Sequence, residues 1–177
     1  MRKLAIAVIF IVVFLLLLFM QSNICPIFPI AGIEPNLILI FVLFIGLFTN
    51  TVFGVSFGVI FGLIIDGVYS SQIGITAVML ALIGFLGAYF DKNFSKEGKI
   101  TLILMVIGCT VLYELGRYVL IGAIQRYSFE WLYFIRILAI EVLYNVLITI
   151  LFYPLIRKTG FGIDRIFKKT NLLTRYF

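Results

Sequence analysis

The sequence contains no histidine and little charge, and these two shortages exclude most catalytic chemistry. Without histidine there is no imidazole base, no His-Asp relay and no histidine-ligated metal. Only 12% of the 177 residues are charged, whereas 63% are hydrophobic. A soluble domain has about 25% charged residues, so this composition indicates an integral membrane protein. We expect it to hold no cofactor and to have no enzymatic activity.

Cysteine is scarce as well. Cys25 lies in a predicted loop and Cys109 lies in the middle of an apolar segment. A disulfide between them would join different depths of a membrane, so we expect both to be unpaired, and too few for a zinc or haem site. The net charge of +6 does not indicate nucleic-acid binding, because the basic residues flank apolar segments, which is typical of topogenic signals.

Long apolar segments dominate the chain instead, and a membrane-spanning helix needs about 20 such residues. The first segment, residues 4–20, follows Arg2 and Lys3 as a signal peptide would. No Ala-x-Ala cleavage site follows it, so we expect a retained anchor. The later segments are residues 37–65, 73–90, 100–121 and 133–156.

Residues 37–65 form either one helix or two. One helix would be about 44 Å long, well over the roughly 30 Å hydrocarbon core, whereas two helices would each be short. A polar group, Thr49-Asn50-Thr51, interrupts the segment. If the chain turns back at Asn50, the basic residues at the N-terminus, in the loop near residue 96 and in the C-terminal tail all fall on one side. The distribution of charge therefore favours a hairpin.

With this hairpin the chain has six spans, and the positive-inside rule places both termini in the cytoplasm. The sequence thus predicts an all-α, six-helix transmembrane domain at residues 1–156 and a basic cytoplasmic tail at residues 157–177. The tail is either a basic amphipathic helix on the inner leaflet, carrying Ile163, Ile166 and Phe167, or a solvated segment. Eleven of the fourteen cations share the cytoplasmic side: Arg2, Lys3, Lys92, Lys96, Lys99, Arg157, Lys158, Arg165, Lys168, Lys169 and Arg175.

A glycine repeat is the most specific local pattern. Gly54, Gly58, Gly62 and Asp66 recur every fourth residue and form one stripe on a helix. A stripe without Cβ atoms lets another helix approach closely, either inside the bundle or in a partner protein. Asp66 is expected to end its helix and begin a turn, with Ser70 or Ser71 helping to cap the next helix.

Charged and polar residues also occur inside the last two spans. Glu114 and Arg117 are three residues apart, and Glu141 and Asn145 are four apart, so each pair shares a helix face. Because ionisable groups are costly in hydrocarbon, we expect them to point inward and to form one buried layer with Arg117 as the shared cation. The layer is either a structural network between the two helices or the floor of a pocket for a solute or a partner segment.

Three stretches of the sequence carry a family pattern: Glu34-Pro35-Asn36-Leu37 at the start of the second span, GVSFGVIFGLIID at residues 54–66, and Gly74-Ile75-Thr76-Ala77. In these stretches the sequence resembles the MreD family of rod shape-determining proteins. Length, six spans and a basic tail also match along essentially the whole chain. The family has no catalytic signature.

The resemblance implies a non-catalytic scaffold subunit of the bacterial cell-elongation machinery, which synthesises peptidoglycan. Its implied partners are MreC and, through MreC, the MreB cytoskeleton and the wall-building transpeptidase and glycosyltransferase. The family is also similar in fold to the substrate-binding components of energy-coupling-factor vitamin transporters, and such a solute-binding subunit is the alternative function. Those components carry an Ala-x-x-x-Ala pattern in the first span. Here Ala5 and Ala7 are two apart, which favours MreD.

Overall fold

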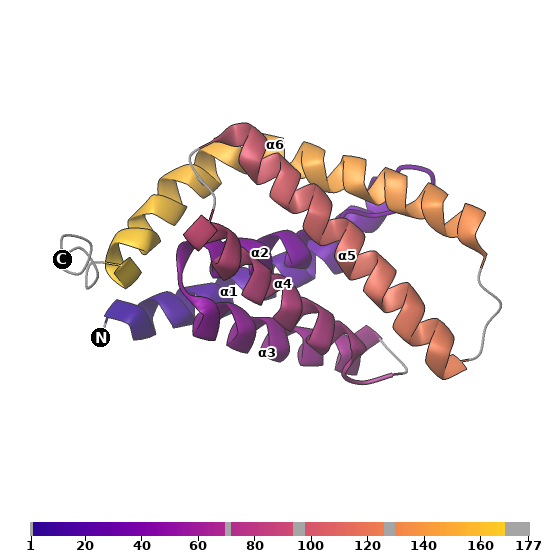
Figure 1. Cartoon of the computed structure of the whole chain (residues 1–177), viewed down its shortest axis with the longest axis horizontal. Coiled ribbons are helices and arrows are strands. Elements are labelled where there is room, and N and C mark those ends of the chain that lie inside the picture. Colours follow the sequence, from indigo (N-terminus) through magenta and orange to yellow (C-terminus); the bar gives the residue numbers. More distant parts are fainter. Residues whose placement is uncertain (1, 70–71, 94–97, 126–129, 169–177) are drawn as a thin grey trace.

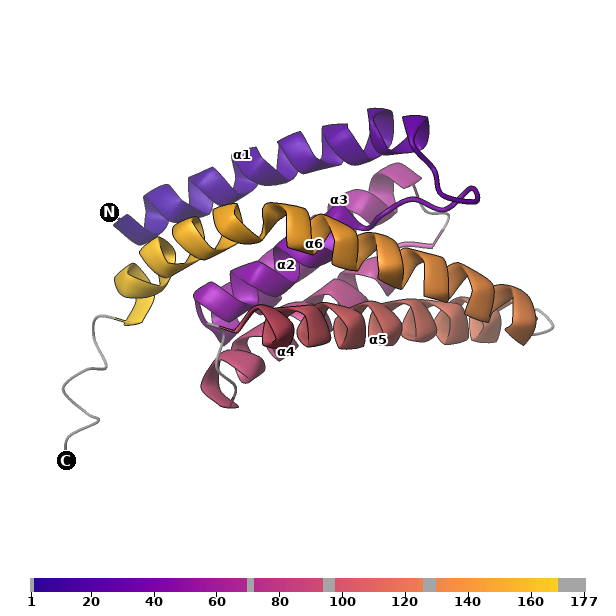
Figure 2. The ribbon, with the colours of Figure 1, turned by 90° about the horizontal axis from the view of Figure 1, so that it is seen from above.

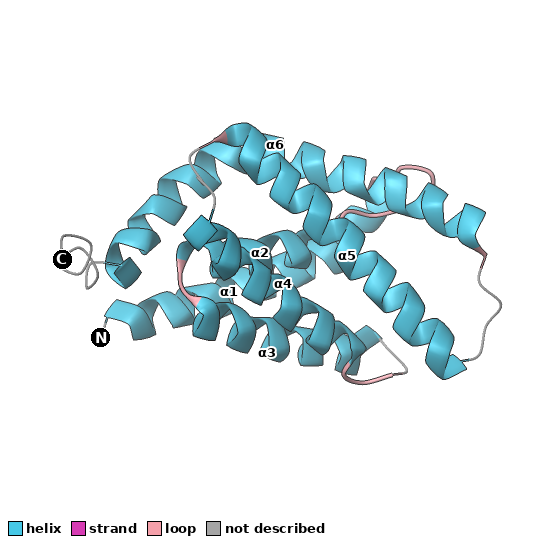
Figure 3. Cartoon of the chain, in the orientation of Figure 1, coloured by secondary structure: helices cyan, strands magenta, loops and turns pink. Residues whose placement is uncertain are grey.

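The computed structural model describes residues 2–69, 72–93, 98–125 and 130–168, and these residues form an all-α bundle (Figure 1). Helices make up nearly all of the described chain, with short loops between them (Figure 3). The α-helices are α1 (Arg2–Asn23), α2 (Leu37–Phe48), α3 (Thr51–Tyr69), α4 (Ile75–Asn93), α5 (Lys99–Gln125) and α6 (Trp131–Lys168), and a short 3₁₀ helix, η1 (Cys25–Ile27), follows α1.

The apolar helices fit a membrane protein, as the composition predicts. Four helical segments in the described part of the chain are long and apolar enough to cross a membrane: Leu4–Ile27, Thr51–Tyr69, Lys99–Gln125 and Trp131–Phe167. The other two apolar helices, Leu37–Phe48 and Ile75–Asp91, are shorter.

Helix α2 is the centre of the bundle. It contacts all five other α-helices, and eleven of its twelve residues are buried. Its sequence, LILIFVLFIGLF, is apolar on every side, and a helix of this kind is stable only when it is surrounded. At 1.5 Å per residue it is about 18 Å long, much shorter than α1 or α5. The shortness of α2 leaves space within the bundle at its N-terminal end.

The predicted break at Asn50 is confirmed, because α2 and α3 are separate helices joined at this residue. The hydroxyl of Thr49 donates a hydrogen bond to the carbonyl oxygen of Ile45 at 2.5 Å, at the end of α2. The side-chain oxygen of Asn50 accepts one from the backbone N–H of Phe53 at 2.9 Å, and so caps the start of α3. The side chains of Thr49 and Asn50 thus form hydrogen bonds with backbone atoms that the two helix ends would otherwise leave unpaired.

Phenylalanine rings join α1 to the central helices. Phe10 and Phe14 are among the few buried residues of α1. The ring of Phe14 stacks on Phe61 of α3 with 3.9 Å between centroids, and Phe10 makes an edge contact with Phe57 at 5.5 Å. Most other side chains of α1 are exposed, so this helix attaches by one narrow face.

Helix α6 continues past residue 156, where the sequence suggested the end of the membrane domain. It runs to Lys168 and contains Pro154, which cannot donate the usual helical hydrogen bond. The helix bends between its orange and yellow parts (Figure 1). Beyond the bend, Phe161 makes an edge contact with Phe48, and the ring of Phe167 packs on Phe53 with centroids 4.8 Å apart.

The apolar face of this tail therefore packs on the protein itself. Ile163 and Ile166 are partly buried against the same core, and Phe167 is buried. The basic side chains of Arg157, Lys158 and Arg165 are exposed on the remaining faces. Figure 2 shows this part of α6 beside the N-terminal part of α1.

Candidate functional site

The glycine stripe lies directly against α4. A Cβ atom on Gly58 would come within 3.0 Å of the Leu80 and Ala81 backbone, and one on Gly62 would meet the backbone of Ala77 and Thr76 equally closely. Real Cβ atoms essentially never approach other atoms so closely. Helix α4 therefore occupies the stripe, and the groove is used inside this chain.

Three glycines from three helices meet at one point of this contact. A Cβ atom on Gly54 of α3 would lie 2.5 Å from the carbonyl oxygen of Gly84 in α4 and 2.9 Å from the Cα of Gly46 in α2. Gly87 of α4 lies equally close to the backbone of α2. The three helices thus pack backbone against backbone, as small-residue contacts in membranes allow.

Asp66 has a different role from the one its position suggested. It does not end α3, which continues to Tyr69. Its Oδ2 atom accepts hydrogen bonds from the backbone N–H groups of Gly74, Thr76 and Ala77, at 2.7, 3.1 and 3.4 Å. Asp66 is fully buried and caps α4 from the neighbouring helix, where a negative charge is favourable. Ser70 and Ser71, the expected capping residues, lie outside the described residues.

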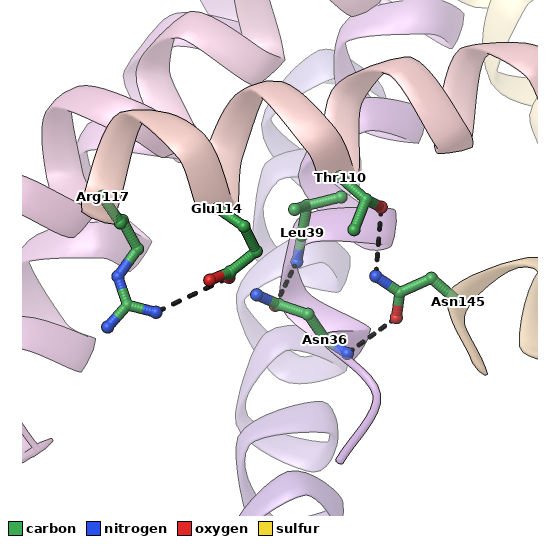
Figure 4. Close-up of polar contacts among 6 residues, drawn as sticks. All are labelled: Asn36, Leu39, Thr110, Glu114, Arg117 and Asn145. Carbon is green, nitrogen blue, oxygen red and sulfur yellow. Dashed lines mark hydrogen bonds and ion pairs between the residues drawn. The ribbon is translucent and has the colours of Figure 1, made fainter. Parts of the chain in front are cut away.

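Asn36 joins the start of α2 to α5 and α6 (Figure 4). Its side-chain oxygen caps α2 by accepting from the N–H of Leu39 at 3.0 Å, and its own N–H donates to Oδ1 of Asn145 at 2.8 Å. Asn145 in turn donates from Nδ2 to the hydroxyl of Thr110 at 3.1 Å. Asn145 and Thr110 are completely buried. The resulting network fixes the loop before α2 in place.

The same loop is held from α1 and shaped by a tight turn. The side-chain oxygen of Gln21 accepts a hydrogen bond from the N–H of Leu37 at 3.1 Å. Ile30 and Ile33 exchange two backbone hydrogen bonds of 3.1 and 3.0 Å. Between them Ala31 and Gly32 both have positive φ, of 52° and 79°.

The charged residues of α5 and α6 lie near one another. Arg117 forms an ion pair with Glu114, with 3.7 Å between Nη1 and Oε1, and its side chain is 37% exposed (Figure 4). Glu141 interacts electrostatically with both residues and is only 6% exposed. The sequence predicted one buried layer with Arg117 as the shared cation, whereas among the described residues Arg117 forms its ion pair with Glu114 and is partly exposed. Asn145 is hydrogen-bonded to the N–H of Asn36 and to Thr110, and the side chain of Asn36 also acts on Glu141.

These three residues line a cavity of about 520 Å³, which we call the Glu141 cavity. It lies between α5, α6 and the loop before α2, at the end of α2 opposite the Asn50 hairpin. Its wall carries both charges and apolar groups, and its remaining lining residues are Gln21, Ala31, Gly32, Ile33, Glu34, Pro35, Asn36, Tyr133, Arg136 and Ile137. The space exists because α2 is short and begins deep in the bundle.

Sequence reasoning missed several members of this site. The residues before α2 carried the family resemblance, but no pattern predicted that they would meet α5 and α6. Thr110 was missed because a threonine in an apolar helix is common and gives no signal of its partner. Its spacing of four from Glu114 is the one clue that it shares a face with the charged layer.

The chemistry available here is ionic and hydrogen-bonding. Both cysteines are free thiols. Among the described residues no group of three or more acidic, cysteine or histidine side chains is placed to hold a metal ion. The carboxyl, guanidinium and amide groups that line the cavity can accept or donate hydrogen bonds and pair with a charge.

The chain matches a protein-family model over most of its length. The model described as rod shape-determining protein MreD covers residues 1–159. The chain belongs to the MreD family. MreD proteins determine rod shape. The match agrees with the resemblance seen at residues 34–37 and 54–66. No curated protein and no solved structure matches it.

Proposed function

We propose that this MreD protein is a non-catalytic membrane scaffold of the cell-elongation machinery that synthesises peptidoglycan. In this role it binds an MreC-like membrane protein and, through it, the MreB cytoskeleton and the wall-building transpeptidase and glycosyltransferase. The observation that carries the proposal is membership of the MreD family along residues 1–159.

The exposed surface of α1 supports a scaffold role. Ile6, Phe10 and Phe14, spaced four apart, are its buried residues within the described part of the helix. Large apolar side chains on its other faces are exposed, among them Leu4, Val8, Val12, Leu15 and Phe19. An apolar helix held by one narrow stripe leaves most of its surface for lipid or for a transmembrane helix of a partner.

We further propose that all six helices lie in the bacterial plasma membrane with both termini in the cytoplasm. The unequal distribution of basic residues between the two sides of the membrane supports this orientation. A 12-residue helix such as α2 is shorter than the bilayer core, but it is surrounded by protein, which satisfies the polar groups at its ends. In this orientation the Glu141 cavity faces outward, as the solute site does in the vitamin-transporter components whose fold we propose to be similar.

Co-purification and complementation test the function. In rod-shaped bacteria that lack their own MreD, expression of this chain with its cognate MreC should restore rod shape, and the two proteins should co-purify from membranes. As a control, Gly67→Leu adds a side chain at a position of α3 where a Cβ atom meets nothing within 4 Å, and this variant should behave like the wild type. A folded protein that neither restores shape nor binds MreC, but increases uptake of a vitamin, would contradict the scaffold and support the transporter alternative.

A further inference from the structure

The Glu141 cavity has more acidic than basic side chains. Its lining includes the carboxyl groups of Glu34, Glu114 and Glu141 and the guanidinium groups of Arg117 and Arg136. Glu114 already has Arg117 as its ion-pair partner at 3.7 Å. Arg136 is exposed, so water can solvate its charge. Among the described residues, Glu34 and Glu141 are therefore the lining carboxyl groups without an ion pair.

Glu141 is the most buried of the three carboxyl groups that line the cavity. It is 6% exposed, and within the described residues no Lys or Arg nitrogen lies within 4.0 Å of its carboxylate. Arg117, already paired with Glu114, acts on it electrostatically, and the other polar neighbours of Glu141, the side chains of Glu114 and Asn36, are not cations. A carboxylate removed from water inside a membrane protein is costly unless a positive group pairs with it.

The rest of the wall suits a cation carried on a hydrocarbon chain. Ile33, Pro35 and Ile137 provide apolar surface. Tyr133, which is 64% exposed, also lines the cavity, and an aromatic ring attracts a cation placed over its face. The volume of about 520 Å³ lies in the range of small-ligand sites, about 300–1,000 Å³. The side-chain oxygens of Gln21 and Asn145 accept hydrogen bonds from the N–H groups of Leu37 and Asn36, which holds the loop before α2 in place, so the site is already formed.

We propose that the Glu141 cavity binds a single alkyl ammonium or guanidinium group, with Glu141 as its counter-ion. The hydrocarbon stem contacts Ile33 and Ile137, and the charged end reaches the floor between α5 and α6. This chemistry is that of a lysine or arginine side chain of a partner protein, or of a free small amine. The proposal does not depend on the scaffold role.

Capped amino acids measure the preference for a cation directly. We would titrate full-length protein in nanodiscs with N-acetyl-lysine amide, with its uncharged analogue N-acetyl-norleucine amide and with N-acetyl-glutamate amide, and follow binding by calorimetry. The lysine probe should bind about tenfold more tightly than norleucine, as expected for a charge-assisted hydrogen bond, and the glutamate probe should bind least. Equal binding of the lysine and norleucine probes, or no binding by either, would overturn the proposal.

Two substitutions should move the affinity in opposite directions. Glu141→Gln keeps the shape of the floor and should lower the affinity for the lysine probe about tenfold. Arg136→Gln removes a positive charge from the wall and should raise it severalfold. Glu130→Gln is the matched control, because Glu130 is exposed and is not part of the lining. If Glu141→Gln fails to fold, Arg136→Gln alone decides, and an unchanged or lower affinity in that variant refutes the site.

Two further measurements identify the source of the cation. Native mass spectrometry of protein purified alone would reveal a bound amine that is lost in Glu141→Gln and retained in Glu130→Gln. A benzoylphenylalanine crosslinker in place of Tyr133, in cells, would instead capture a partner peptide that contains lysine or arginine, with the same dependence on Glu141. Either result supports the cavity as a cation site and names the source. A bound molecule or crosslink that is insensitive to Glu141→Gln contradicts it.

Discussion

The contact between α3 and α4 is made by backbone, whereas the region around the Glu141 cavity is connected by side chains. Gly54, Gly58 and Gly62 have no Cβ atoms, so peptide groups of α4 approach this face of α3 closely. No space is left between the two helices there. Around the cavity, Asn36, Asn145 and Thr110 connect three helices at single points and leave an open volume beside them.

This difference shows how one small bundle combines rigidity with a site. Close packing in hydrocarbon depends on van der Waals contact, because lipid tails compete equally well for apolar side chains. The short helix α2 takes part in both regions. Its C-terminal half is in contact with α4 through Gly46, and its N-terminal end holds the loop that forms one wall of the cavity.

The largest expected effect comes from filling the backbone contact. Gly58→Leu places a side chain where backbone atoms of Leu80 and Ala81 would already lie within 3.0 Å of a Cβ atom, so α3 and α4 must separate. We expect loss of monodisperse protein in detergent. Gly67→Leu, on the same helix, meets nothing within 4 Å and should purify normally. Equal behaviour of the two variants in size-exclusion chromatography would show that the close contact is not required.

Substitutions of Asp66 test the contact between α3 and α4 at the start of α4. Asp66→Ala removes the acceptor of three backbone N–H groups at the buried start of α4, and we expect a loss of about 3 kcal/mol in the free energy of unfolding. Asp66→Asn keeps one side-chain oxygen as acceptor and should cost less. Chemical unfolding in detergent measures both. An Asp66→Ala protein as stable as the wild type would mean that other groups cap α4.

The helices could be predicted from the sequence, but their neighbours could not. Thr49 and Asn50 marked the hairpin because polar groups in an apolar segment satisfy helix ends. The glycine spacing indicated a close contact without identifying α4 as the helix that makes it, since a flat stripe fits any partner helix. Asp66 was misread for the same reason. Its carboxylate caps a helix that begins nine residues later, and the local sequence does not show how close the two helices lie on either side of the turn.

The charged residues of the site could be predicted from the sequence, but the cavity that they line could not. Glu114, Arg117 and Glu141 were identified by the cost of placing ionisable groups in a membrane. The cavity arises from the short α2 and from the loop at residues 31–36, which depend on the packing of the whole bundle. The sequence left a helical tail open as one of two alternatives, but it did not predict that the tail continues α6 to Lys168, because Pro154 and the basic residues after it are typical of a helix end. Phe161 and Phe167 hold this part on the hairpin.

Asn145 tests the side-chain network at the cavity. Asn145→Ala leaves the N–H of Asn36 and the hydroxyl of Thr110 without this partner, and we expect a loss of about 2 kcal/mol in unfolding free energy. Thr110→Val keeps nearly the same shape and breaks one of these bonds, so it should cost about half as much, roughly 1 kcal/mol. Thermal unfolding of both variants provides the comparison. Equal losses would indicate that the bond to Asn36 contributes nothing.

The smallest effect is expected for the ion pair between Glu114 and Arg117. A fully buried pair would be strongly destabilised by removing one partner, typically by about 3–5 kcal/mol. Here the nitrogen and oxygen are 3.7 Å apart and the Arg117 side chain is 37% exposed, so solvent in the cavity screens the attraction. A double-mutant cycle with Glu114→Gln and Arg117→Gln should therefore give a coupling energy of about 0.5–1 kcal/mol, which falls as salt increases. A coupling above about 2 kcal/mol that salt does not change would mean that the cavity excludes water, and its walls would then resemble the closed contact of α3 with α4.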